Sequence, residues 1–156
     1  MTLKSYLALI TISTITIIVV AIALLFGYSL QNAYLDGISK RGLELARVVA
    51  HDDNVILAVK ASNLGQPTSL QNHIESLRSQ IDASYIVVVN KKAVRLSHPT
   101  ESLVGQVFIG DDIYPVLEEG HVLTSIAKGS LGEAIRNFAP IRDESGIIGA
   151  VSVGYL

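Results

Sequence analysis

The chain has 156 residues, and about thirty of them form one apolar run at the N-terminus, so there is room for one small folded domain. Twelve Lys and Arg against 14 Asp and Glu give a formal net charge of −2, which argues against a basic surface for nucleic acid. The lack of cysteine excludes disulfide bonds, thiolate metal sites and cysteine nucleophiles.

The first segment has the composition of a transmembrane helix. No charged side chain occurs between Ser5 and Leu35, and residues 7–27 are mostly Leu, Ile, Val, Ala and Thr. About twenty such residues in a helix cross the roughly 30 Å hydrocarbon core of a bilayer. We therefore predict a short cytoplasmic tail at 1–6, a membrane-spanning helix at 7–27 and an extracytoplasmic domain at 28–156.

The alternative for this segment is a cleavable signal peptide. Lys4 gives a positive start, and Ala21-Ile22-Ala23 has the small residues of a cleavage site. The apolar run is longer than such peptides usually have, and cleavage there would leave an apolar new terminus, so we favour the anchor. Basic residues flank the run on both sides, at Lys4 and at Lys40-Arg41, so charge does not fix the orientation.

Helices are expected to follow the anchor. Apolar residues recur at helical intervals over Tyr34–Lys60, which predicts a stalk helix. Asp52 and its neighbours predict the cap of a second, short helix over Val55–Ala61, and a capping role is a commoner use of these carboxylates than metal binding. Gln71 lies three residues after the start of Thr68–Gln80, and this spacing is typical of a capping box that opens a third helix.

The second half of the chain has the pattern of an antiparallel sheet. β-branched runs are separated by turn sequences, and a short helix is expected to start at Asp111 or Asp112. Short connections make neighbouring strands antiparallel, so we predict an α+β domain with a sheet of about five strands packed on the N-terminal helices. The predicted strands are Tyr85–Val89, Ala93–Ser97, His121–Lys128, Glu133–Ile141 and Ile147–Tyr155.

Cationic side chains recur at the predicted strands. Arg95 and His98 end one strand, and Arg136 shares a face of a later strand with Phe138, because side chains two apart point the same way. The turn Gly129–Gly132 offers backbone amides and a hydroxyl for an anion. Each feature alone is ordinary, but two guanidinium groups and an imidazole together suit a small acid with two carboxylates.

Several spaced motifs resemble one family over the whole chain, anchor included. It is the family of citrate and C4-dicarboxylate sensor histidine kinases, the CitA/DcuS type, with its periplasmic PAS-like domain of the PDC or single Cache kind. The motifs are Arg95-Leu96-Ser97-His98-Pro99, Gly105-Gln106, Phe108, the stretch Ser125–Gly132, Arg136, Pro140-Ile141 and the stretch Gly149–Tyr155.

The resemblance implies which residues bind the ligand. It implies that Arg95, His98 and Arg136 contact carboxylates. The other residues implied in the pocket are Phe108, Gly129, Ser130, Leu131, Phe138 and Ser152. In this family, the position two after Arg136 tends to be Lys for citrate and Phe for C4-dicarboxylates. Phe138 therefore favours malate, fumarate or succinate over citrate, because an aromatic ring cannot compensate a third buried charge.

The resemblance also implies a receptor larger than this chain. A second transmembrane helix would follow Leu156, movement of the last strand would reach a cytoplasmic kinase, and a response regulator would receive the phosphoryl group. A homodimer in the inner membrane is expected. No cofactor, metal or nucleic acid is expected.

Two other classes of function are considered. Ser125 and Lys128 have the Ser-x-x-Lys spacing of some serine enzymes, but in a strand they face opposite sides. His51, His73 and His121 lack partners at metal-ligand spacing and are expected at the surface or in turns. A chemoreceptor or another Cache-type receptor remains open, because it differs from a kinase only in sequence beyond Leu156.

Overall fold

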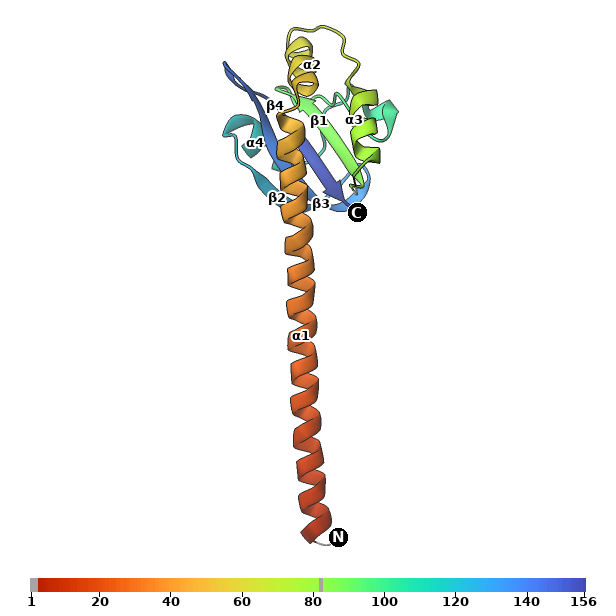
Figure 1. Ribbon diagram of the computed structural model, residues 1–156, viewed down its shortest axis with the longest axis vertical. Helices are drawn as coiled ribbons and strands as arrows, with labels where there is room; N and C mark the ends of the chain where they lie inside the picture. Colours follow the sequence, from red (N-terminus) through yellow and green to blue (C-terminus); the bar gives the residue numbers. More distant parts are fainter. Residues whose placement is uncertain (1–2, 82) are drawn as a thin grey trace. The chain divides into compact units, whose positions relative to one another are not determined.

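The computed structural model describes residues 3–81 and 83–156. It confirms the α+β class, with helices first and an antiparallel sheet after them (Figure 1). The helices are α1 (Leu3–Ala50), α2 (Asp53–Asn63), α3 (Leu70–Ser79) and α4 (Tyr114–Glu118), with short 3₁₀ turns η1 (Glu101–Leu103) and η2 (Asp111–Ile113). The strands are β1 (Tyr85–Asn90), β2 (Leu123–Gly129), β3 (Gly132–Asp143) and β4 (Gly146–Tyr155).

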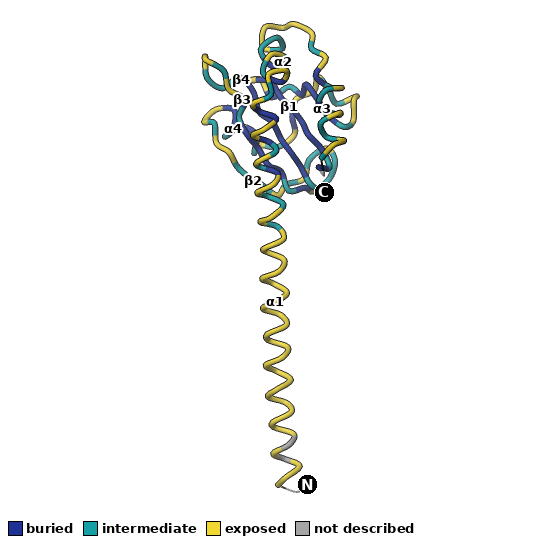
Figure 2. Tube along the Cα trace, viewed as in Figure 1, coloured by how far each residue is buried: buried dark blue, intermediate teal, exposed yellow. Residues whose placement is uncertain are grey.

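The N-terminal part of α1 is long and apolar enough to cross a membrane. Residues up to Gly37 form a unit of their own, and most of its described apolar side chains are exposed, as the mostly yellow trace of this helix in Figure 2 shows. An apolar helix without packing partners favours a lipid environment over water. The span at 7–27 and the tail at 1–6 stay predictions.

The stalk helix predicted over Tyr34–Lys60 ends earlier than expected. α1 stops at Ala50, and Asp52 adopts an extended backbone with φ −69° and ψ 123°. Its side chain accepts a hydrogen bond from the Asn54 amide at 2.8 Å, so the predicted cap of the second helix is confirmed. The cap is the physical reason for the break, because it gives the first amides of α2 a partner outside α1.

The predicted capping box at Thr68 is wrong. α3 begins one residue later than such a box requires, at Leu70, and its N-cap Ser69 makes no side-chain cap hydrogen bond. Gln71 instead bonds the backbone of His98: its Nε2 donates to the carbonyl at 2.8 Å and its Oε1 accepts from the amide at 2.9 Å. Gln71 therefore forms hydrogen bonds with a residue 27 positions away instead of with the start of its own helix.

The described residues form one sheet with strand order β1-β4-β3-β2 (Figure 1). All neighbouring pairs are antiparallel, and β2, β3 and β4 follow one another as the predicted meander. The turn between β2 and β3 is Ser130-Leu131, where a turn was expected. β4 lies between β1 and β3, so the last strand occupies the interior of the sheet.

The fifth predicted strand, Ala93–Ser97, does not form. The segment makes only isolated bridges, Val89 with Arg95 and Val94 with Val107. Ala93 has a positive φ of 57°, and the Val88 amide donates to the Ser97 hydroxyl at 2.9 Å instead of to a backbone carbonyl. A side-chain acceptor therefore ends the ladder just before Pro99, which has no amide hydrogen to donate.

Both faces of the sheet are covered, as the dark strands in Figure 2 indicate. On one face, the end of α1 with α2 and α3 packs on alternate residues of the strands, such as Ile86 and Val88. On the other, η2 and α4 pack on the intervening residues, such as Val87 and Phe138. The period of two along each strand decides which side chains reach which face.

One close contact joins the helix face of the sheet to α1. Asn137 of β3 is fully buried; its Nδ2 donates to the Val153 carbonyl at 3.3 Å and its Oδ1 accepts from Thr124 Oγ1 at 2.8 Å. A Cβ on Gly42 would lie 2.1 Å from that Nδ2. Glycine is therefore required where α1 crosses β3.

Candidate functional site

A small pocket lies on the face of the sheet opposite α2 and α3. Arg95, His98 and Phe108 come from the segments after β1, and Arg136 comes from β3. The full lining is Tyr85, Val87, Arg95, His98, Phe108, Ile109, Gly129, Ser130, Leu131, Gly132 and Arg136. Seven of the nine residues predicted for the site are thus brought together from separate parts of the chain.

Arg136 projects from β3 into this pocket and is only 2% exposed. Its Nη2 donates to the Ile109 carbonyl at 3.0 Å, and its Nη1 lies 3.3 Å from Oδ2 of Asp112. The Cζ atom lies 4.7 Å from the ring centre of Phe108 and 5.4 Å from that of Phe138. The guanidinium is thus held between aromatic rings, while its Nε has no hydrogen-bond partner among the described residues.

Arg95 is buried as deeply, at 2% exposure, in the segment that follows β1. Two backbone hydrogen bonds fix Arg95. Its amide donates to the Gln106 carbonyl at 2.9 Å, and the Arg95 carbonyl accepts from the Gly105 amide at 2.8 Å. Its side-chain Nε and Nη1 have no hydrogen-bond partner in the part of the chain that the structure describes. Burial, and then the charge of Arg136, lower the pKa of this guanidinium.

His98 connects two sides of the pocket. Its Nδ1 accepts from the Thr100 amide at 2.9 Å, so the neutral ring carries its hydrogen on Nε2 and donates to Ser130 Oγ at 2.9 Å. Burial lowers the pKa of His98 and the charge of Arg95 lowers it further, while the Thr100 carbonyl, 3.1 Å from Nδ1, opposes both because it favours a protonated ring. The imidazole is therefore a neutral donor near pH 7.

This arrangement has the chemistry of an anion site. Two guanidinium groups stay charged even when buried, because arginine is not deprotonated in proteins. Buried charges without partners are costly, and charge-assisted hydrogen bonds to carboxylate oxygens are the strong way to satisfy them. The free Nε and Nη1 of Arg95 and the free Nε of Arg136 are donors of that kind.

The enclosed space is narrow, about 20 Å³. That is room for about one water molecule. A dicarboxylate needs more space than this, so the pocket as described is too small to hold one. The His98–Ser130 hydrogen bond joins the turn at Ser130-Leu131 to the segment after β1.

Sequence reasoning missed three features of the pocket. Tyr85 of β1 lines it opposite Gly154 of β4, where a Cβ would lie 1.9 Å from the tyrosine ring. Burial raises the pKa of Tyr85 although the Arg136 charge opposes it, so the phenol stays neutral. Gly110 is tight as well: a Cβ there would lie 2.7 Å from Arg136 Nη1. The third missed feature is Asp112, which pairs with Arg136 at 3.3 Å. The position of Tyr85 could have been predicted, because side chains alternate between the two faces of β1 and Tyr85 shares a face with Val87.

Two predicted site residues, Phe138 and Ser152, are not among the lining residues. Both are buried, and they face each other across β3 and β4. Phe138 packs against Phe108 with ring centres 6.0 Å apart and supports Arg136. Phe138 therefore contacts the guanidinium of Arg136 without being part of the pocket lining.

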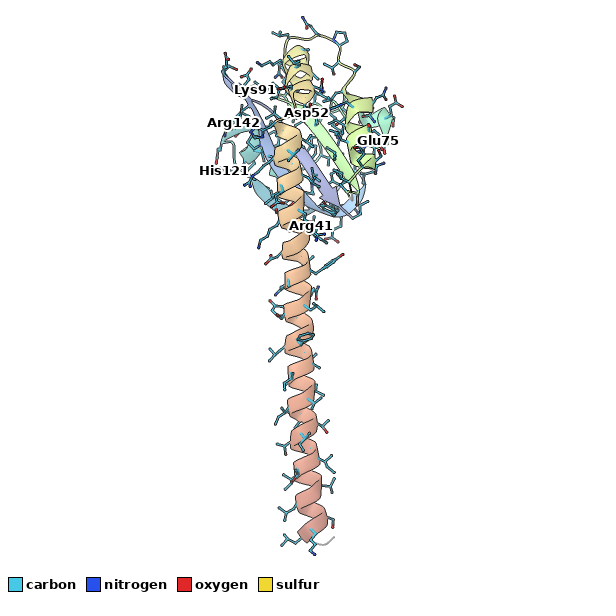
Figure 3. All side chains as sticks on the ribbon, in the orientation of Figure 1. Arg41, Asp52, Glu75, Lys91, His121 and Arg142 are labelled. Carbon is cyan, nitrogen blue, oxygen red and sulfur yellow. The ribbon has the colours of Figure 1, made fainter. Side chains whose placement is uncertain are left out.

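The residues considered for other chemistry lie elsewhere. Ser125 and Lys128 are three apart in β2 and face opposite sides, as predicted. His121 is exposed at the periphery (Figure 3), His51 is exposed and His73 pairs with Asp52 at 2.8 Å. Among the described residues, no three His, Cys, Asp or Glu side chains gather as a metal site.

Residues 29–156 match the sequence profile of the family described as "Single cache domain 3". The chain belongs to this Cache family. The match covers the domain that carries the pocket and leaves out the apolar start of α1. The family resemblance inferred from the motifs is therefore confirmed, and the residues that line the pocket all lie within the matched range.

The relatives of this Cache domain are sensor kinases. The sensor protein CitS of Halalkalibacterium halodurans is 34% identical over 91% of the chain and 27% of its own length. The sensor histidine kinase DcuS of Escherichia coli K12 is 30% identical over 88% of the chain and 25% of its own length. The chain thus spans about a quarter of the length of these curated relatives.

Solved structures agree with these relatives. The crystal structure of the E. coli DcuS sensor domain matches with a TM-score of 0.70 and 33% identity, covering 77% of this chain and 89% of that one. A second structure, described as the sensory domain of the membraneous two-component fumarate sensor DcuS, matches with a TM-score of 0.52 and 30% identity, covering 76% and 86%.

Proposed function

We propose that this chain is the extracytoplasmic input module of a membrane-bound sensor histidine kinase, and that it binds a C4-dicarboxylate in the pocket between Arg95 and Arg136. The observation that carries the proposal is the pair of buried guanidinium groups with unpaired nitrogens facing one cavity. The description of the relative DcuS as a fumarate sensor supports the choice of ligand class.

In the proposed complex, one carboxylate lies against Arg136 and the other against Arg95, with His98 and Ser130 as neutral donors. Phe108 stacks near both guanidinium groups, at 5.6 Å from Arg95 Cζ, and keeps the site dry. No lysine lines the pocket as described, so a third carboxylate would lack a cation. This favours fumarate, malate or succinate over citrate.

The signalling part of the proposal concerns the rest of the receptor. The apolar part of α1 would anchor the module in the cell membrane, and two copies would pair as in a homodimer. Ligand binding would move β4, and the kinase beyond Leu156 would then phosphorylate a response regulator. These steps rest on the relation to sensor histidine kinases that are about four times longer than this chain.

The test is isothermal titration of the whole chain in detergent with fumarate, malate, succinate and citrate. We expect the C4 acids to bind and Arg136→Ala to weaken binding by about a hundredfold or more, because a buried charge pair is lost. Arg142→Ala is the matched control: Arg142 lies in the same strand, is exposed, and only bonds the Gly120 carbonyl at 3.4 Å (Figure 3).

Two results would refute the proposal. One is a wild-type chain that unfolds cooperatively but binds none of the four acids. The other is an equal loss of binding in Arg142→Ala and Arg136→Ala, which would show that the effect does not come from the pocket. Stronger binding of citrate than of every C4 acid would refute only the choice of ligand.

A further inference from the structure

A carboxylate of the protein already occupies one side of the pocket arginine. Asp112 of η2 places its Oδ2 3.3 Å from Arg136 Nη1, and the same oxygen accepts a hydrogen bond from Ser125 Oγ at 2.5 Å. Its Oδ1 is buried without a hydrogen-bond partner in the described part of the chain. Gly110 confines both groups, because its Cβ position is 2.7 Å from Asp112 Oδ1 and from Arg136 Nη1.

The charges around the pocket do not balance a doubly charged ligand. Arg95 and Arg136 contribute two positive charges and Asp112 one negative charge, so the net charge is +1 while His98 is neutral. Tyr85 from β1 and Ser125 from β2 complete the surroundings of Asp112, and both are uncharged. A dianion would bring the total to −1.

We propose that Asp112 sets the charge selectivity of the site: it is a resident counter-ion of Arg136 that opposes the binding of anions with two or more charges. This inference rests on the proposed function. The repulsion acts over a few ångströms away from bulk water, where charges are screened far less than at the surface. The receptor would respond only at high ligand concentrations because of this residue.

The contrasting role for Asp112 is purely structural, as the group that holds Arg136 in position. The Ile109 carbonyl already accepts from Arg136 Nη2 at 3.0 Å, and the rings of Phe108 and Phe138 fix the guanidinium plane. The unpaired Oδ1 indicates that the ion pair is incompletely satisfied. An asparagine keeps one oxygen that can accept from Ser125, removes the charge and replaces the other oxygen with an NH2 donor.

The two roles predict opposite effects of Asp112→Asn. The experiment is calorimetric titration of the whole chain in detergent at pH 7.5 and fixed ionic strength, with succinate as the dianion and its monomethyl ester as the monoanion. We expect Asp112→Asn to bind succinate about tenfold more tightly than the wild type. The gain for the monoanion should be clearly smaller.

Asp111→Asn is the matched control. It removes the same charge from the neighbouring, exposed position, and we expect succinate affinity to stay within about twofold of the wild type. Asp112→Ser provides a second neutral side chain if Asp112→Asn does not fold, as judged by the thermal unfolding of the ligand-free protein.

Weaker or unchanged succinate binding in a folded neutral variant would overturn the inference and leave the proposed function standing. Equal gains for succinate and the monoester would also overturn it, because the effect would not follow ligand charge. If neither the wild type nor the neutral variants bind any carboxylate, the proposed function itself fails.

Discussion

His98 holds its proton less readily in the folded protein than in the unfolded chain, because burial and then Arg95 lower its pKa below the usual 6.5. Below pH 6.5 the unfolded chain therefore binds a proton that the folded protein does not. The contribution of His98 to the unfolding free energy should be fully present above pH 6.5 and should be lost as the pH decreases toward the folded-state pKa. One proton gives a slope of at most about 1.4 kcal/mol per pH unit.

The measurement is urea unfolding at pH 7.5 and 5.5 for the wild type and His98→Gln. We expect the wild type to lose more of its unfolding free energy than His98→Gln over this interval. His121→Gln removes an exposed histidine and should keep the wild-type slope. Equal slopes in the wild type and His98→Gln would contradict the prediction.

Individual residues show why the site could be predicted only in part. Arg136 could be placed because a period of two along a strand is a local property, whereas Arg95 and His98 were predicted at the end of a strand that does not form, and their place in the pocket was implied by the motif resemblance. Asp112 and Tyr85 were missed because their roles depend on neighbours from other strands. Gln71 was misassigned because its partner, His98, lies across the fold.

Packing of α1 on the sheet depends on one glycine. A methyl group at Gly42 would overlap the Asn137 amide, which is itself held by Thr124 and Val153. We expect Gly42→Ala to lower the unfolding free energy by about 1–3 kcal/mol, as overpacking does elsewhere. Urea unfolding of the whole chain in detergent, followed by circular dichroism, measures this.

Gly37→Ala is the control in the same helix, because nothing lies within 4 Å of its Cβ position. Alanine there should raise the unfolding free energy of the helix by about 0.5–1 kcal/mol, since glycine is a weaker helix former. If both substitutions stabilise the protein, α1 does not press on β3 at this point.

The elements themselves follow the sequence where a local signal is strong. The β-branched run at Val87–Val89 and the cap at Asp52 give β1 and α2 close to the expected bounds. The failed strand at Ala93–Ser97 has strand-like composition, but the turn before it needs a left-handed Ala93 and the Ser97 hydroxyl replaces a ladder bond. Composition does not reveal such side-chain substitutions.

The whole chain combines two units with different solvent needs. Residues 1–37 carry the exposed apolar helix, and the unit from Ile38 to Leu156 contains the hydrophobic core and the pocket. We predict that a chain beginning at Ile38 stays monodisperse without detergent and unfolds cooperatively on heating. The full chain should require detergent, because the apolar helix would otherwise self-associate.

Light scattering and thermal circular dichroism test both statements. Aggregation of the shorter chain, or loss of its cooperative transition, would show that the first 37 residues contribute to the fold of the domain. The titrations proposed above can be repeated on the shorter chain if it behaves as expected.

Neighbouring residues of β3 have opposite surroundings: Arg136 points to the anion pocket and Asn137 is seated against α1 at Gly42. A single peptide link joins the two, and Asn137 is fully buried. If the pocket binds a carboxylate as proposed, a shift of the backbone at Arg136 would also reach Asn137, which lies against α1 at Gly42.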